Sequence, residues 1–175
     1  IELRGPIPAE LRPLIGNRVY GCDICQEVCP FTTKFSAPST EPAYSPKADF
    51  DGPPLVELAE RLLAMSGKGF LHEFAASPVT RAGRKGLLRN VCVGLGNWGV
   101  EAAVPTLVSA LSDTAPLVRG HAAWALGRVD SPSAFEALSA RLEEESDPFV
   151  LEEIGLALGE MTSLFGAGRD RLGVE

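Results

Sequence analysis

A thirty-residue repeat in the second half of the chain limits the possible folds more than any other feature. The stretches VCVGLGN (91–97), AAWALGR (122–128) and IGLALGE (154–160) align on their Leu-Gly pairs, with spacings of 31 and 32 residues. A second helical stretch follows each of the first two, at 102–113 and 133–147. Each unit is therefore predicted to be a helix, a turn and a second helix. Such a pair buries its apolar face only against the next pair, so the units should stack into an α-solenoid.

Small residues stand at matching places in the three units. Gly94, Ala125 and Ala157 precede the aligned leucines, where close helix packing would need little side chain. The pattern resembles a short array of HEAT-type repeats; an ordinary helical bundle is the alternative, which the matching periods disfavour. Trp124 takes a core position in the second unit, so Trp124→Ala is expected to cost about 3–5 kcal/mol.

Proline and charge divide the rest of the chain. Residues 1–55 hold most of the prolines and read as irregular, apart from a short helix over 9–16. An irregular connection is expected at 36–54 and a helical repeat domain over 55–175, in a fold that is mainly α. The formal net charge of −7 argues against indiscriminate binding of polyanions.

Two composition arguments bear on location. No apolar run is long enough to cross a bilayer, so no membrane partner is expected. Four cysteines in 175 residues are too few for a disulfide scaffold, and a reducing cytoplasm is the default location. The chain begins at Ile1 rather than Met, and IELRGPIP reads as the middle of a longer sequence.

A basic stretch, SPVTRAGRKGLLRN (77–90), leads into the first repeat. Its cations are Arg81, Arg84, Lys85 and Arg89. Arg119 holds a nearly equivalent place in the second repeat. Clustered cations can contact nucleic-acid phosphates, but solvated helix ends are the common alternative. For Arg89 and Arg119, bracing of neighbouring turns or pairing with acids such as Asp113 is an equal alternative.

Three cysteines crowd into GCDICQEVCP (21–30), with the spacing C-x2-C-x3-C-P. Zinc would want separated Cys pairs or added histidines, and the other candidates are only His72, His121 and Cys92. Cys92 lies in an apolar helical stretch and is predicted to pack in the core. A redox C-x-x-C pair would not explain the third cysteine. The bacterial ferredoxin run C-x2-C-x2-C-x3-C-P contains this spacing, so an iron–sulfur role for Cys22, Cys25 and Cys29 is favoured.

The whole N-terminal stretch resembles the second ferredoxin-type segment of the epoxyqueuosine reductase family. The matching residues are Ile1, Glu2, Gly5 to Pro8, Arg12, Gly16 to Arg18, Tyr20 to Asp23, Cys25, Gln26, Cys29 and Pro30. SPVTRAGRKGLLRNVCVGLGNWG and PLVRGHAAWALG are likewise similar to the helical tail of that family. The resemblance implies that residues 1–35 are the C-terminal part of a ferredoxin-like domain with two [4Fe–4S] clusters, ahead of HEAT-like repeats.

The resemblance also implies roles for these residues. Cys22 and Cys25 would join one cluster and Cys29 the other, with the remaining ligands upstream. Catalytic residues and the cobalamin site would lie in an N-terminal part outside this chain, so no catalytic residue is expected here and the chain alone should be inactive. The reaction would be reduction of epoxyqueuosine to queuosine in the tRNA anticodon loop by a monomeric enzyme.

The resemblance leaves the tRNA-binding residues and two other functions open. Arg81, Arg84, Lys85, Arg89 and Arg119 are the candidates for contacts with tRNA. The electron donor is not identified by any residue pattern. A non-enzymatic α-solenoid adaptor with a cysteine-bound metal, and a generic ferredoxin-type electron carrier, are the alternatives.

Overall fold

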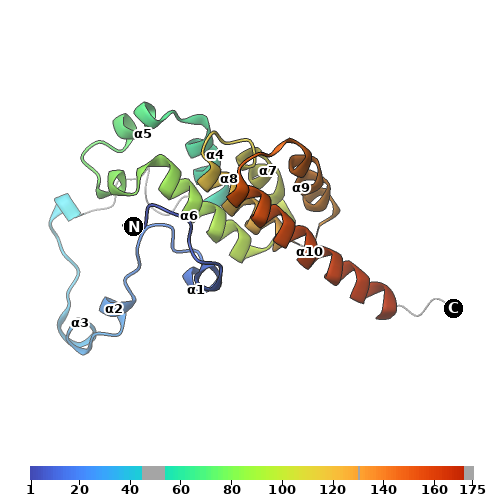
Figure 1. Cartoon of the computed structure of the whole chain (residues 1–175). Coiled ribbons are helices and arrows are strands. Elements are labelled where there is room, and N and C mark those ends of the chain that lie inside the picture. Colours follow the sequence, from blue (N-terminus) through green and yellow to red (C-terminus); the bar gives the residue numbers. More distant parts are fainter. Residues whose placement is uncertain (45–53, 130, 172–175) are drawn as a thin grey trace.

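The computed structural model describes residues 1–44, 54–129 and 131–171, and in these residues it contains helices and no strand (Figure 1). The repeat helices are α6 (Gly83–Trp98), α7 (Val104–Ala110), α8 (Pro116–Gly127), α9 (Pro132–Glu144) and α10 (Pro148–Arg171). Ahead of them come α4 (Leu55–Ala64) and α5 (Gly67–Glu73), with short 3-10 turns at Pro78–Arg81 and Glu101–Ala103. The chain is mainly α, as the sequence predicts.

The helices form two rows, as expected for an α-solenoid. Helix α8 packs against both α6 and α10, so the first helices of the three units make one row (Figure 1). The second helices, α7 and α9, contact each other and α8 and make the second row. Prolines stand at the first turns of α8, α9 and α10. Proline suits this position because its ring fixes φ near the helical value, and because an N–H group there would have no acceptor within the helix. Gly99, with φ 65°, ends α6 in the left-handed conformation.

The Leu-Gly pairs lie where the row is tightest. A Cβ atom on Gly96 would lie 2.8 Å from the Cα of Ala125, and one on Gly127 would lie 2.9 Å from the Cα of Ala157. Gly96 therefore packs directly against Ala125, and Gly127 against Ala157. The predicted packing role of both alanines is confirmed. Gly94 differs, because its nearest neighbour is Leu55 of α4, at 3.0 Å from the Cβ position.

The core runs along the first row. Every residue of α6 from 86 to 96 is buried, including Cys92 at 1% exposure, which confirms its predicted core position. Burial raises the pKa of the Cys92 thiol to about 12. Trp124 is only partly buried, but it packs against the buried core, so its predicted core contact is confirmed and full burial is not. It stacks beneath the guanidinium of Arg12, 5.4 Å from Cζ to the ring centroid, and near that of Arg128 at 6.0 Å.

The N-terminal residues divide into two stretches with different surroundings. Residues 1–20, the lead, contain a 3-10 turn (Ala9–Leu11) and α1 (Arg12–Ile15), and α1 packs against α6 (Figure 1). Residues 21–44 carry α2 (Ile24–Glu27), α3 (Pro30–Phe35) and a 3-10 turn at Pro42–Tyr44, and are exposed almost throughout. Residues 36–44 are irregular apart from that turn; the rest of the expected connection, up to 53, lies outside the described residues.

Candidate iron–sulfur segment and basic edge

The three clustered cysteines lie on the exposed stretch that follows the lead. Cys22 precedes α2, Cys25 lies within it, and Cys29 is the N-cap residue of α3. Cys22 and Cys25 are exposed and Cys29 is partly exposed. Hydrogen bonds from the main chain and side chain of Thr32, and from the main chain of Phe31, lower the pKa of the Cys29 thiol. The sulfur that an iron ion would bind as thiolate is thus favoured in that form.

Among the described residues, the three thiols do not form a metal site by themselves. In the part of the chain that the structure describes, no three His, Cys, Asp or Glu side chains gather to hold a metal ion. Cys22 and Cys25 are exposed and Cys29 is partly exposed, so ligands from another segment could reach each of them. Cysteine thiolates are the usual ligands of iron–sulfur clusters, so the residues present fit a role as part of the ligand set of such clusters.

Two of the predicted tRNA-binding cations are turned inward at the first repeat. Arg84 donates to the Leu62 carbonyl at 3.0 Å and pairs with Asp113 at 2.5 Å. Arg89 is 2% exposed, and its Nη1 donates to the carbonyls of Leu3 at 2.9 Å and Gly5 at 2.7 Å. These contacts fit the bracing alternative, because both guanidiniums already hold internal acceptors.

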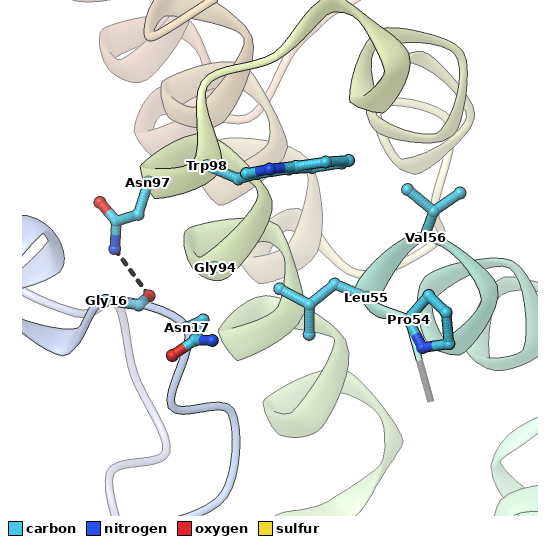
Figure 2. Close-up of a pocket in the computed structure, with 8 residues that line it drawn as sticks. All are labelled: Gly16, Asn17, Pro54, Leu55, Val56, Gly94, Asn97 and Trp98. Atoms are coloured by element: carbon cyan, nitrogen blue, oxygen red, sulfur yellow. Dashed lines mark hydrogen bonds between the residues drawn. The ribbon is translucent and has the colours of Figure 1, made fainter. Parts of the chain in front are cut away.

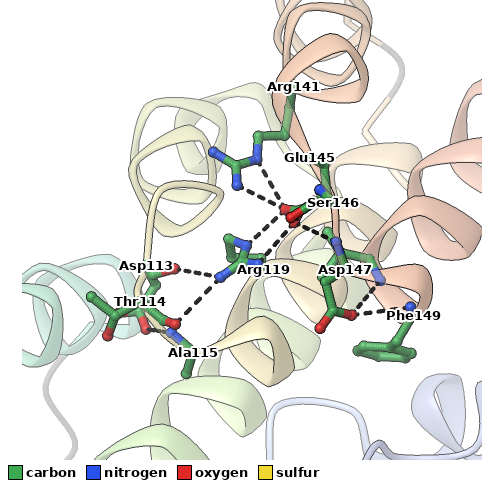
Figure 3. Close-up of polar contacts among 10 residues, drawn as sticks. Asp113, Thr114, Ala115, Arg119, Arg141, Glu145, Ser146, Asp147 and Phe149 are labelled. Atoms are coloured by element: carbon green, nitrogen blue, oxygen red, sulfur yellow. Dashed lines mark hydrogen bonds and ion pairs between the residues drawn. The ribbon is translucent and has the colours of Figure 1, made fainter.

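Arg119 is braced in the same way within the second repeat (Figure 3). It forms a bidentate pair with Glu145 at 2.8 and 2.9 Å and donates to the Asp113 carbonyl at 3.0 Å. Arg141 contacts the same carboxylate at 2.8 Å. The Arg119 guanidinium, together with main-chain donors at Ser146 and Asp147, holds the pKa of Glu145 well below its usual range.

Arg81, at the end of the 3-10 turn Pro78–Arg81, and Lys85, in the first turn of α6, are both exposed and remain the candidates for phosphate contact. Arg81 pairs with Glu2 of the lead, and both side chains are more than 60% exposed. Arg4, 64% exposed, reaches the main-chain carbonyl of Arg81 and so adds a third cation here. We call Arg4, Arg81 and Lys85 the basic edge. Sequence reasoning missed Arg4 because 77 residues separate it from Arg81 and no local pattern links the two.

Sequence reasoning also missed the side chains that fasten the lead to the repeats. Asn90 donates to the Val19 carbonyl at 2.8 Å, and Asn97 donates to the carbonyls of Arg12 and Gly16 at 2.8 and 2.9 Å. Three further residues, Arg12, His121 and Glu153, form buried contacts that link the lead to α8 and α10. A buried polar residue in a predicted helix is a signal for such contacts, but sequence alone does not identify the partner.

A pocket of about 580 Å³ lies where the lead meets α4 and α6 (Figure 2). Gly16 and Asn17 line its lead side, Leu55 lies opposite them, and Trp98 borders it with its side chain 54% exposed. Asn97, also at its rim, is occupied by the hydrogen bond to Gly16 that Figure 2 shows. The pocket is thus a solvent-open gap between the lead and helices α4 and α6.

These features define a class: a helical-repeat protein joined to part of a double-cluster iron–sulfur segment. Residues 79–159 match the model of HEAT repeats, and residues 1–32 match that of the 4Fe-4S double cluster binding domain. Among the described residues, no helix is both long and apolar enough to cross a membrane.

Named relatives narrow the class to one family. The chain is 41% identical over 128 residues to epoxyqueuosine reductase of Escherichia coli (strain K12), covering 73% of this chain and 32% of the relative. It is 44% identical over 131 residues to that of Pseudomonas aeruginosa, covering 73% and 34%. A crystal structure of epoxyqueuosine reductase with an epoxyqueuosine-modified tRNA-Tyr stem loop superposes with a TM-score of 0.81 at 33% identity, covering 92% of this chain and 42% of that one. The chain belongs to the epoxyqueuosine reductase family and spans about a third of the length of these curated relatives.

Proposed function

We propose that this chain is the C-terminal part of an enzyme that reduces epoxyqueuosine to queuosine in tRNA. The observation that carries the proposal is one of arrangement. A C-x2-C-x3-C-P segment is fastened onto a HEAT-like array, and the same chain superposes over 92% of its length on the tRNA-bound reductase. A stand-alone adaptor would not need thiols in the spacing of a two-cluster ferredoxin.

The thiolate segment would share in two [4Fe–4S] clusters. Cys22 and Cys25 would ligate one cluster and Cys29 the other, each completed by upstream cysteines of the same protein. When bound, the clusters supply one-electron transfer. This chain's residues present the thiolates, and the Thr32 and Phe31 donors stabilise Cys29 in its charged form. Cobalamin, the group that the family resemblance implies for the chemistry on the epoxide, would be bound outside this chain.

The repeats would hold tRNA by its phosphates at the basic edge. Arg81 and Lys85 are accessible there, whereas residues 101–175 carry thirteen acids against five arginines and would repel the backbone. Phosphate contacts fix position and leave the reading of the modified base to the rest of the enzyme. We propose that the complete enzyme is a cytoplasmic monomer.

The test uses the complete protein, prepared without oxygen and given an epoxyqueuosine-modified tRNA stem loop. The expected result is queuosine in the digested RNA, measured by mass spectrometry. Cys22→Ser and Cys29→Ser should each lower bound iron and sulfide, whereas Cys92→Ala, at a buried thiol, should leave iron unchanged. Retention of all iron by both serine variants would contradict the ligand assignment.

A second measurement addresses this 175-residue chain alone. Its three thiols are assigned to two clusters, so it should not assemble a complete four-iron cluster on reconstitution. A stoichiometric, EPR-active [4Fe–4S] cluster on the monomeric chain would overturn the assignment.

A further inference from the structure

The lead is held by its main chain, at points spread over the row of repeat helices. Arg89 of α6 donates to the carbonyls of Leu3 and Gly5, and Asn97, also of α6, donates to those of Arg12 and Gly16. His121 of α8 accepts the Ile7 N–H at 3.0 Å. Hydrogen bonds to the main chain fix the path of the backbone itself, whatever side chains it carries.

Arg12 of the lead contacts all three repeat units, through α6, α8 and α10. The Arg12 guanidinium donates to both carboxylate oxygens of Glu153 on α10, at 2.7 and 2.5 Å, and its Nε donates to the Ile7 carbonyl at 2.8 Å. It lies over Trp124 of α8, and the Arg12 carbonyl accepts from Asn97 of α6. The two charged side chains of the pair are 2% and 9% exposed.

Such a pair is a poor source of stability but a strong constraint on geometry. Removing two charges from water carries a large desolvation penalty, and the attraction between the charges roughly offsets it. A buried ion pair therefore often contributes little net stability compared with apolar side chains. A planar guanidinium facing a carboxylate with two parallel hydrogen bonds, however, permits one relative placement of the two segments. The Arg12–Glu153 pair therefore adds a constraint from α10 to the hydrogen bonds by which α6 and α8 hold the lead.

The placement of the lead also determines the position of Cys22, the first of the three thiols. Tyr20 donates its hydroxyl proton to the Pro78 carbonyl, and Cys22 follows two residues later. Beyond Gly21, the hydrogen bonds of the described residues up to 44 are all local to that stretch. The position of Cys22 relative to the repeats thus depends on the fastening of the lead.

We infer that Arg12 and Glu153 are positioning residues: they hold the Cys22 thiolate at one place relative to the repeats and their basic edge. As a role in a reaction, this inference rests on the proposed function. A cluster ligand and an RNA-holding surface on one rigid body would keep the clusters and the bound RNA at a fixed separation, and catalytic geometry tolerates displacements of only about 0.5 Å.

The first test measures position in this chain, independently of any reaction. Spin labels are placed on Cys22, in a Cys25→Ser/Cys29→Ser background, and on Ala140→Cys, at an exposed site of α9. Pulsed dipolar EPR should give a narrow distance distribution that broadens at least twofold in Glu153→Gln and in Arg12→Lys, which keeps the charge but loses the planar fork. Glu145→Gln, which removes a buried carboxylate from a pair inside the repeats, is the control and should keep the narrow distribution. Equal widths in all four proteins, or a broad distribution without substitution, would overturn the inference.

The second test uses the complete, cluster-loaded protein. Glu153→Gln and Arg12→Lys should lower kcat about tenfold or more, as displacements far from the chemistry can. Iron content and affinity for the modified stem loop should stay within about twofold of the parent. Unchanged kcat in both variants would show that the pair has no positioning role. Absence of turnover in the unsubstituted protein would instead count against the proposed function, and the distance measurement would still decide the placement.

Discussion

The Nε2 atom of His121 accepts a hydrogen bond from the main-chain N–H of Ile7, and its Nδ1 lies 2.7 Å from the Leu117 carbonyl. The ring is fully buried. Accepting at Nε2 requires an unprotonated nitrogen there, so the imidazole is neutral with its proton on Nδ1. Burial, with Arg12 and Arg89 nearby, lowers the pKa of His121 from 6.5 to about 3.

A pH dependence of stability follows from this hydrogen bond. Between pH 6.5 and about 3 the unfolded chain binds a proton at His121 that the folded chain does not. The free energy of unfolding should therefore fall as the pH drops through this window, by up to about 1.4 kcal/mol per pH unit. Urea unfolding between about pH 5 and 6.5 measures the slope, above the range where Asp and Glu titrate. His121→Gln can keep both hydrogen bonds but does not titrate, so it should flatten the slope; an unchanged slope would refute the assignment.

Glycines at equivalent repeat positions should respond differently to the same substitution. Gly96→Ala and Gly127→Ala would place a methyl group within 3 Å of the next helix, so each should destabilise the chain by about 1–3 kcal/mol through overpacking. Gly159 holds the same place in the third unit but has nothing within 4 Å. Gly159→Ala should be neutral or stabilising by up to about 1 kcal/mol, because alanine favours the helix. Thermal unfolding of the three variants gives the comparison, and similar losses of stability in all three would mean that the glycines are not packing positions.

Hydrogen exchange should separate the lead from the stretch that follows it. Slow exchange is expected in 87–95, which is buried throughout, and in the helical segments 122–126 and 154–158, which are buried on one side; fast exchange is expected in 31–44, which is exposed. Amides of the lead near Ile7 should also be protected, because His121 and Arg89 hold it. Mass spectrometry of peptic fragments resolves these regions. Exchange in the lead as fast as in 31–44 would show that its fastening is transient.

For nucleic acid, the basic edge gives a sharper experiment than substituting every cation. Arg81→Ala/Lys85→Ala changes exposed side chains and removes one exposed ion pair, that of Arg81 with Glu2, whereas changing Arg84 or Arg89 removes hydrogen bonds of more buried side chains. In the complete protein the double variant should weaken binding of the stem loop and flatten its salt dependence by up to about 0.9 for each duplex phosphate that is no longer neutralised. Lys68→Ala, at an exposed cation on α5, is the charge control. Unaltered affinity and salt slope in a folded double variant would move the RNA-binding surface elsewhere.

Much of the fold could be predicted because the repeat is local. The stretches 91–97, 122–128 and 154–160 each show apolar residues at helical spacing, which predicts a helix from local sequence alone. The repeated Leu-Gly spacing in turn indicates that these helices stack. The same reasoning places Trp124 in the core, whereas the structure shows a partly buried side chain that packs against the core. The repeat pattern cannot show that the lead covers this position and brings a guanidinium to the ring. For a partly buried ring that packs against the core, a loss of about 2 kcal/mol in Trp124→Ala is the appropriate expectation.

The site was less predictable because its interactions join distant parts of the chain. The cysteine spacing is a local motif, so Cys22, Cys25 and Cys29 could be proposed as ligands from sequence. A positive charge, in contrast, looks the same in sequence whether it faces phosphate or a carboxylate. Arg84, Arg89 and Arg119 all meet acceptors between 22 and 86 residues away, and those partners become evident only in the folded structure.

The separation of Arg12 from Glu153 has a consequence for biosynthesis. The two are 141 residues apart, and ribosomes add about 5–20 residues per second. Arg12 is therefore synthesised roughly 7–28 s before its partner. During that interval the repeats can begin to stack from local interactions, but the lead has no complete docking surface. The lead can therefore reach its final place on the row only late in synthesis, after Glu153 has been added.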